Sequence, residues 1–181
     1  MHMTSQLSNG PIVPRRIQLG YQLHLPVIHG DSMAPAQADP FLLESELYRL
    51  IRNHPDQKRD RLEWDVDLQT IARRRCENMR RDQYVGHVDP DGHGPNWWVH
   101  HYGELPDWYE HDGDVNWIES IRLGPGDAAD ALAALLFSPR HRDHVLGEGW
   151  FGGQWRMGIG CGPTWEEPVP AQFIFCILTC H

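Results

Sequence analysis

The chain has 181 residues, 40% of them hydrophobic, and a net charge of −9. This length suits one domain with some additional chain, and the apolar content is sufficient for a core. The acidic balance argues against nucleic acid as a partner, because phosphates are bound by clustered lysine and arginine. We expect no membrane span, since no stretch approaches the roughly 20 apolar residues that one needs. We also expect no signal peptide, because the N-terminal segment is polar.

Residues 1–36 predict an N-terminal arm that contains one β-strand and no core of its own. Between Pro14 and Pro26, apolar residues alternate with polar ones, which is the pattern of a half-buried strand. We interpret this strand as a docking element, because an extended segment can pair with the sheet edge of a protein partner or of a second copy. The alternative is an edge strand added to its own domain. The alternating apolar residues are Ile17, Leu19, Tyr21, Leu23 and Leu25.

Two amphipathic helices are predicted next. The first begins at Asp39-Pro40, where proline in the first turn sacrifices no hydrogen bond, and it ends before Pro55. The second follows Leu62-Glu63-Trp64-Asp65 and has apolar residues at helical spacing. Its arginines predict a solvated helix face. They are Arg73, Arg74, Arg75, Arg80 and Arg81.

Residues 86–115 predict a long irregular segment with a short helix at 96–102. Segments of this kind in a domain are usually functional or mobile. The Asp-Pro-Asp-Gly run that begins at Asp89 predicts a turn rather than a set of metal ligands. We interpret the histidines of this segment as surface residues near a cleft. We interpret its aromatic residues as core, and the alternative is that they form a wall of a ligand site. The histidines are His93, His100, His101 and His111, and the aromatic residues are Trp97, Trp98, Tyr102, Trp108 and Tyr109.

The C-terminal part predicts three strands and one helix. Residues 116–122 predict a strand, and Asp127 caps a helix over 128–137 that is apolar nearly all round and therefore buried. Residues 155–161 and 172–180 predict a hairpin, whose second strand is apolar on both faces and so central in the sheet. The interleaved elements indicate an α+β fold, a three-layer α-β-α sandwich. The sequence leaves the disulfide state of the four cysteines open, and one or two bridges are possible; the cysteines are Cys76, Cys161, Cys176 and Cys180.

Four motifs in order give residues 37–181 a resemblance to a known family. The chain resembles the CAP superfamily (cysteine-rich secretory proteins, antigen 5 and pathogenesis-related proteins), and most of all its bacterial SCP-like branch. The first motif is the helix pattern that begins at Leu62. The others are Gly86-His87 with Asp89-Pro90-Asp91-Gly92, then Glu119-Ser120-Ile121, which is similar to Glu-Asn-Ile-Ala, and Ser138-Pro139-Arg140-His141-Arg142, which resembles Ser-Pro-Gly-His-Arg.

The resemblance implies that His87, Glu119 and His141 line one cavity that can take a divalent cation such as zinc. Two neutral imidazoles and a carboxylate leave a position on zinc open for water or a ligand. The alternative is a hydrogen-bond network that braces loops over the sheet. The chain departs from the family in ways that weaken the case for a shared ligand, and it has no second cavity glutamate near Ser138. The departures are Ser120 in place of Asn, Arg122 in place of Ala, Leu135 in place of Trp and His144 in place of Asn.

We therefore expect a binding or structural module rather than an enzyme. In this interpretation the arm anchors a CAP-like domain in a larger assembly, such as a virion or a surface particle, at an extracellular or virion-associated location. The cleft would bind a metal, a small apolar ligand or a peptide. The alternative is a metal-dependent hydrolase of peptide or ester bonds, in which Glu119 stands beside a metal-bound water. We assign no catalytic residue, because Ser138 more simply begins the turn before Pro139 than acts as a nucleophile with His141.

Overall fold

The computed structural model describes residues 39–125, 127–165 and 172–181. All of them belong to the unit Gln37–His181. The predicted arm, with its strand from Ile17 to Leu25, lies outside the described residues, so its docking role and the division at residue 36 stay predictions.

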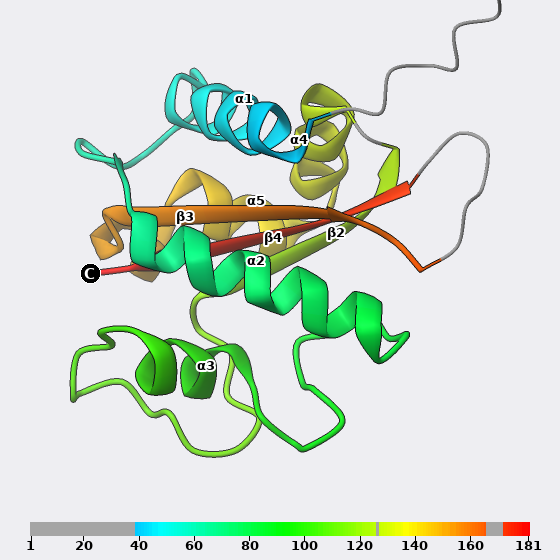
Figure 1. The fold of residues 1–181 in the computed structure, drawn as a ribbon. Coiled ribbons are helices and arrows are strands. Elements are labelled where there is room, and N and C mark those ends of the chain that lie inside the picture. The colour runs from blue at the N-terminus through cyan, green and yellow to red at the C-terminus, as the bar shows by residue number, and fades with distance from the viewer. Residues whose placement is uncertain (1–38, 126, 166–171) are drawn as a thin grey trace, which may run out of the picture. The chain divides into compact units, whose positions relative to one another are not determined.

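The described residues form five α-helices, one 3-10 helix and four strands (Figure 1). Both long helices begin after the aspartates that the sequence indicated, since Asp39 accepts a hydrogen bond from the Phe41 amide and Asp65 one from the Leu68 amide. In chain order the elements are α1 (Pro40–Arg52), β1 (Glu63–Trp64), α2 (Val66–Arg81), α3 (Pro95–Tyr102), β2 (Glu119–Pro125), α4 (Ala128–Phe137), α5 (Pro139–Leu146), the 3-10 helix η1 (Gly149–Gly153), β3 (Arg156–Pro163) and β4 (Gln172–Cys180).

The four strands form one mixed sheet with the order β1-β3-β4-β2. β4 pairs antiparallel with β2 on one side and with β3 on the other, while β1 pairs parallel with β3. β4 is buried along its length after Gln172. The predicted hairpin and the central place of its second strand are therefore confirmed.

Helices cover both faces of the sheet (Figure 1). On one face, α2 and α3 pack over Ile174, Cys176 and Leu178 of β4. On the other face, α1, α4 and α5 pack over Phe175 and Ile177. Because successive β4 residues point to opposite faces, one apolar strand supplies both cores. The predicted α-β-α sandwich is confirmed.

Two glycines of β3 allow α2 to lie directly against the sheet. A Cβ at Gly158 would stand 2.1 Å from the backbone nitrogen of Gln69, and one at Gly160 would stand 2.3 Å from the backbone carbon of Ala72. Such distances leave no room for a side chain, so α2 is fixed close to β3. This close contact sets the position of the α2 residues that reach the site described below.

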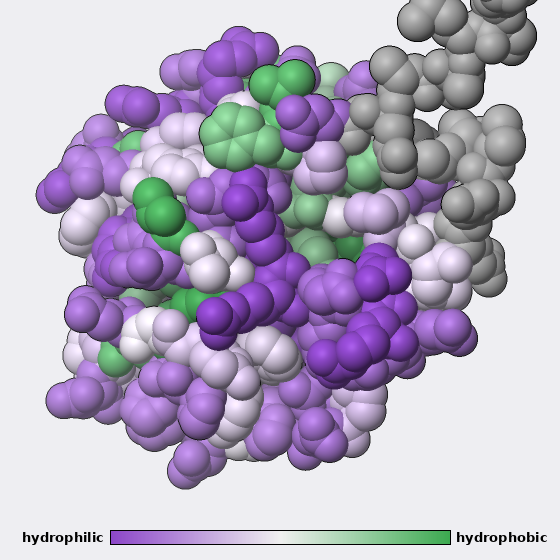
Figure 2. Space-filling view, viewed as in Figure 1, coloured by the Kyte–Doolittle hydropathy of each residue, from purple (hydrophilic) through white to green (hydrophobic). Residues whose placement is uncertain are grey.

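The outer face of α2 carries most of the arginines that predict a solvated surface. Arg73, Arg74 and Arg81 are exposed and Arg80 is partly exposed. Figure 2 shows that this side of the molecule is mostly hydrophilic, with small and separate apolar patches. The prediction is wrong for Arg75, which is fully buried.

Two further expectations are corrected. The strand predicted from residue 116 begins at Glu119, because the Asn116 side chain accepts hydrogen bonds from the backbone amides of Ile118 and Glu119 and forms a turn there. α4 is not buried all round, since Phe137 is 92% exposed. α5 and the short β1 were not expected.

The four cysteines are buried and free, which answers the question of disulfides that the sequence left open. Among the described helices, none combines the length and the apolar character that crossing a membrane requires.

Candidate functional site

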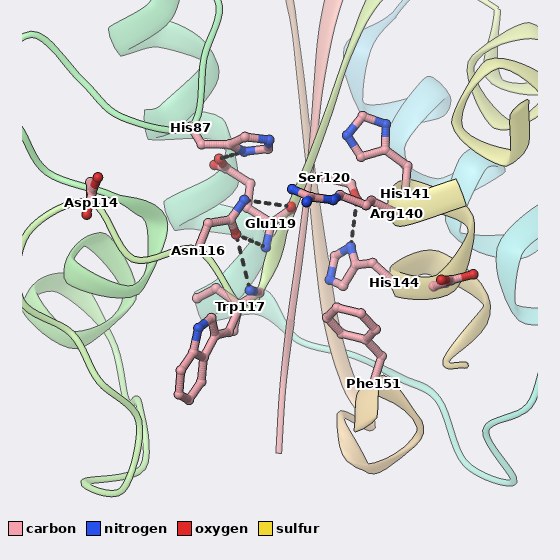
Figure 3. A pocket seen from close by; sticks show the side chains of 12 residues that line it. His87, Asp114, Asn116, Trp117, Glu119, Ser120, Arg140, His141, His144 and Phe151 are labelled. Carbon is pink, nitrogen blue, oxygen red and sulfur yellow. Dashed lines mark hydrogen bonds and ion pairs between the residues drawn. The ribbon is translucent and has the colours of Figure 1, made fainter. Parts of the chain in front are cut away.

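A cleft of about 470 Å³ lies where the segment after α2, the start of β2 and the start of α5 meet (Figure 3). Its volume falls within the range of about 300–1,000 Å³ that is usual for ligand sites. All three residues that the resemblance placed together, His87, Glu119 and His141, line it. The full lining is His87, Asp114, Asn116, Trp117, Ile118, Glu119, Ser120, Arg140, His141, Asp143, His144 and Phe151.

Both carboxylate oxygens of Glu119 are already engaged inside the protein. Arg75 Nε donates to Oε1 at 3.0 Å, and His87 Nδ1 lies 2.9 Å from Oε2. The Cys176 thiol donates to Oε1 at 3.2 Å. The side chains of Arg75 and Glu119 are both 0% exposed, so each charge requires the other. Glu119 therefore organises the site from beneath it.

Arg75 is the functional residue that sequence reasoning missed. Besides Glu119, its guanidinium donates to the Tyr84 hydroxyl at 3.1 Å and to the backbone carbonyls of Gly86 and His87 at 3.1 and 2.8 Å. It thus ties the loop that carries His87 to helix α2. The signal was present in the sequence, because Arg75 stands four residues before Met79 on the apolar stripe of the helix.

The Arg75–Glu119 pair is charged at neutral pH. Burial by itself raises the pKa of Glu119, but the charge of Arg75 and the hydrogen bond from His87 outweigh burial and hold this pKa below its ordinary value. For Arg75, burial lowers the pKa, and the charge of Glu119 more than compensates, so that the pKa is raised. A carboxylate with a depressed pKa is a weak base.

The imidazoles of His87 and His141 lie on opposite sides of the cleft (Figure 3). An ionised carboxylate only accepts hydrogen bonds, so His87 donates from Nδ1 to Glu119 and presents Nε2. The ring centroids of His87 and His141 are 6.4 Å apart. Burial and the neighbouring His87 lower the pKa of His141, which is therefore neutral at pH 7.

The donor set fits a divalent cation only in part. Among the described residues, the one group that brings three ligand atoms within 4.8 Å of one another is Asp89, Asp91 and His93, and not the set His87, Glu119 and His141. Glu119 instead matches the carboxylate that orients a metal-binding histidine. The donors left for a cation are the two imidazoles, fewer than the three protein ligands of typical catalytic zinc sites.

The Asp89 segment forms the turn that the sequence predicts. Asp89 Oδ1 accepts hydrogen bonds from the backbone amides of Asp91 and His93 at 3.0 and 2.8 Å. Its Oδ2 accepts one from Trp98 Nε1 at 3.0 Å. These bonds hold the loop against α3, and they occupy the carboxylate that a cation at this place would need.

A chain of buried neutral hydrogen bonds also starts at the cleft. Ser120 Oγ lies 2.7 Å from His144 Nδ1, and His144 Nε2 lies 2.7 Å from Thr179 Oγ1. Thr179 then donates to Gln154 Oε1 at 2.5 Å. From Gln154 the chain continues through the Tyr109 hydroxyl to His181 Nδ1, over distances of 3.0 and 2.7 Å.

The donor and acceptor roles along this chain of hydrogen bonds follow from one backbone carbonyl. Gln154 Nε2 donates to the Trp117 carbonyl, which fixes the amide so that its Oε1 accepts from the Thr179 hydroxyl. The Thr179 oxygen then accepts from His144 Nε2–H. His144 Nδ1 is left as the acceptor of the Ser120 hydroxyl. Burial lowers the pKa of His144 well below its ordinary value, and the nearby charge of Arg59 lowers it further, so this imidazole is neutral.

An aromatic hollow of about 340 Å³ adjoins the cleft and shares three lining residues with it. It is lined by Asn116, Trp117, Trp150 and Phe151. The sequence interpretation named none of its aromatic residues. Of the set it did name as core, Trp98 and Tyr109 are buried, whereas Trp108 is 58% exposed.

The histidines expected near the cleft do not line it. His93 and His101 stack on Trp97, with ring centroids 3.7 and 4.6 Å away, and His100 stacks on His111 at 3.7 Å. These contacts use the imidazoles as flat aromatic surfaces in the irregular segment.

No family model matches the chain, and no curated protein matches it. Among solved structures, the fold is similar to an extracellular protein containing an SCP domain from Bacillus anthracis str. Ames, with a TM-score of 0.54 and 14% identity over 77% of this chain. The fold is of the SCP/CAP type. The chain spans 41% of the length of that Bacillus protein. An outer surface protein from Borrelia burgdorferi is similar with a TM-score of 0.49 and 15% identity, over 78% of this chain and 90% of its own.

At these identities the likeness concerns the SCP/CAP-type fold alone. It agrees with the family resemblance that the motifs indicated. The placement of His87, Glu119 and His141 around one cleft is an observation on this chain and does not depend on either structure.

Proposed function

We propose that the chain is a non-catalytic binding module of SCP type and that the cleft is its ligand site. The state of Glu119 is the observation that carries this proposal. A general base or a metal ligand needs a free lone pair directed into the cleft, whereas both oxygens of Glu119 accept hydrogen bonds from Arg75, His87 and Cys176. The carboxylate positions His87 and leaves the imidazoles and Arg140 to meet a ligand.

The proposal includes an anchored, extracellular location. The alternating apolar residues from Ile17 to Leu25 predict a strand that is suited to pairing with a partner's sheet edge, and the similar Bacillus protein is described as extracellular. We propose that the arm holds the domain in a larger assembly, such as a virion or a surface particle. Deletion of residues 1–36 is then expected to abolish incorporation into the assembly and to leave the folding of the domain intact, as measured by co-purification and circular dichroism. Normal incorporation of the truncated protein would refute the anchor.

A metal-dependent hydrolase is the second candidate, and the His87–Glu119 pair favours it. The carboxylate keeps the His87 proton on Nδ1 and leaves Nε2 free, as in histidines that bind zinc. His87 and His141 would hold the cation, which when bound would supply Lewis-acid polarisation of a peptide or ester carbonyl.

One titration separates the two candidates. Zn²⁺ is titrated calorimetrically into the full chain and into His87→Ala, His141→Ala and the control His101→Ala, and hydrolysis of peptide and ester substrates is assayed with and without chelator. The binding module is expected to show no chelator-sensitive turnover and an unchanged melting temperature in chelator. Turnover that chelator stops and that either cleft substitution abolishes, with His101→Ala active, would establish the hydrolase instead.

A further inference from the structure

Among the described residues, Arg140 is a cation of the cleft without a charged partner. Its guanidinium lies toward the middle of the cleft in Figure 3 and has no hydrogen bond or ion pair with any described residue. Arg142, two residues later on α5, differs because it pairs with Asp143 at 3.4 Å. In the motif that residues 138–142 resemble, glycine stands at the position of Arg140, so this charge is a property of the present chain.

The acidic groups around the cleft leave the charge of Arg140 unbalanced. Glu119 is neutralised from below by the buried Arg75. Asp143 is engaged by Arg142, and Asp114 stands at the margin of the cleft in Figure 3, away from its middle. A chain with a net charge of −9 thus has, in the part that the structure describes, a guanidinium without a charged partner inside a concave site. Guanidinium groups bind carboxylates through paired, charge-assisted hydrogen bonds.

The aromatic hollow continues from this cationic part. Asn116, Trp117 and Phe151 line both cavities, so that a single ligand can occupy the two. Trp117 and Trp150 are 40% and 47% exposed, and their rings are 5.6 Å apart at an angle of 81°. At this distance and angle the two rings are in edge-to-face contact, so together they form an aromatic wall of the hollow against which a flat group can pack.

We infer that the cleft binds an aromatic carboxylate, with its anionic group on Arg140 and its ring in the hollow of Trp117, Trp150 and Phe151. The inference rests on the proposed binding function and names its ligand class. Charge complementarity selects an anion, and the adjoining aromatic walls select a flat apolar group on that anion. The C-terminal residue of a peptide that ends in phenylalanine has this chemistry, as does a free aromatic acid.

The test uses two ligands of the same shape that differ in charge. N-acetyl-L-phenylalanine and its neutral amide are titrated into the full chain, with tryptophan fluorescence and calorimetry as readouts. The acid is expected to bind about tenfold more tightly than the amide, which is the usual size of one charge-assisted pair. Titration of N-acetyl-Ala-Ala-Phe then separates the sources, because tighter binding than that of the single residue identifies a peptide terminus and equal binding identifies a free acid.

Two substitutions assign the parts of the site. Arg140→Gln is expected to remove the preference for the acid, while the matched control Arg142→Gln keeps it. Trp150→Ala is expected to weaken the acid and the amide by the same factor. Arg140 and Trp150 are exposed, so both variants are expected to fold, and an unchanged circular dichroism spectrum checks this.

The inference is overturned if acid and amide bind equally, or if inorganic phosphate binds as tightly as N-acetyl-L-phenylalanine, since the hollow would then be unused. It is also overturned if neither compound binds. None of these results decides between the binding module and the hydrolase, which are separated by the assay of chelator-sensitive turnover.

Discussion

Consecutive residues at the start of β2, Glu119 and Ser120, begin two buried polar clusters of opposite character. Glu119 points to the α2 face of the sheet, where Arg75 and His87 complete a charged cluster. Ser120 points to the opposite face, where His144 begins a neutral hydrogen-bond chain. The alternation of side chains along a strand places the two clusters back to back.

The two clusters meet the cost of burial in different ways. In the charged cluster, one carboxylate and one guanidinium compensate each other, and removal of either leaves an unpaired charge in the core. In the neutral chain, substitution of one residue breaks only the hydrogen bonds of that residue. The cost in stability is therefore limited to the groups that were bonded to it. The charged cluster is therefore the more sensitive of the two.

Substitution of Arg75 is expected to have the largest effect. Arg75→Met leaves Glu119 buried without its cation and frees the loop that carries His87, so the free energy of unfolding falls by about 3–5 kcal/mol. Urea denaturation measures the loss, and Arg74→Met, an exposed neighbour on the same helix, is the matched control. A change below about 1 kcal/mol would mean that the pair is no more important than a surface ion pair.

Interruption of the neutral chain is expected to cost less. Thr179→Val leaves His144 Nε2–H and Gln154 Oε1 without partners, at about 1–3 kcal/mol. Thr179→Ser keeps the hydroxyl and loses one methyl group, at about 0.8 kcal/mol.

Nitrogen-15 chemical shifts of the imidazole test the direction of the same chain. Native His144 is expected to carry its proton on Nε2. A proton on Nδ1 would show that the chain runs the other way.

The smallest expected effect is a pH dependence of stability, to which the two clusters contribute in separate pH ranges. The pKa of His144 lies well below 6.5 in the folded chain, so the unfolded chain binds more protons as pH falls through 6.5, and stability declines from there. Glu119 has a folded pKa below 4.5, and its contribution is lost only as pH falls further, through that lower value.

Urea denaturation between pH 8 and pH 3 measures both ranges. His144→Asn is expected to reduce the slope of the free energy of unfolding against pH just below pH 6.5. Part of the slope remains, because burial also lowers the pKa values of His141 and His181. An unchanged slope in that variant would contradict the neutral state assigned to His144.

The sequence by itself determined the elements whose causes are local. Asp39 and Asp127 cap their helices because a side-chain oxygen next to a helix start meets free amides. The central place of β4 followed from its uninterrupted apolar composition. The motifs also identified the three residues His87, Glu119 and His141, which the structure brings to one cleft.

Tertiary structure alone decided what those residues are free to do. The residue type alone predicts that an arginine on a helix is exposed to solvent. Only the contact of α2 with the sheet shows that Arg75 is buried against Glu119. The pairing of Ser120 with His144 and the place of Arg140 in the cleft likewise depend on the approach of α5 to the start of β2. These relations join residues far apart in the chain, and local patterns carry no information about which distant partner satisfies a buried polar group.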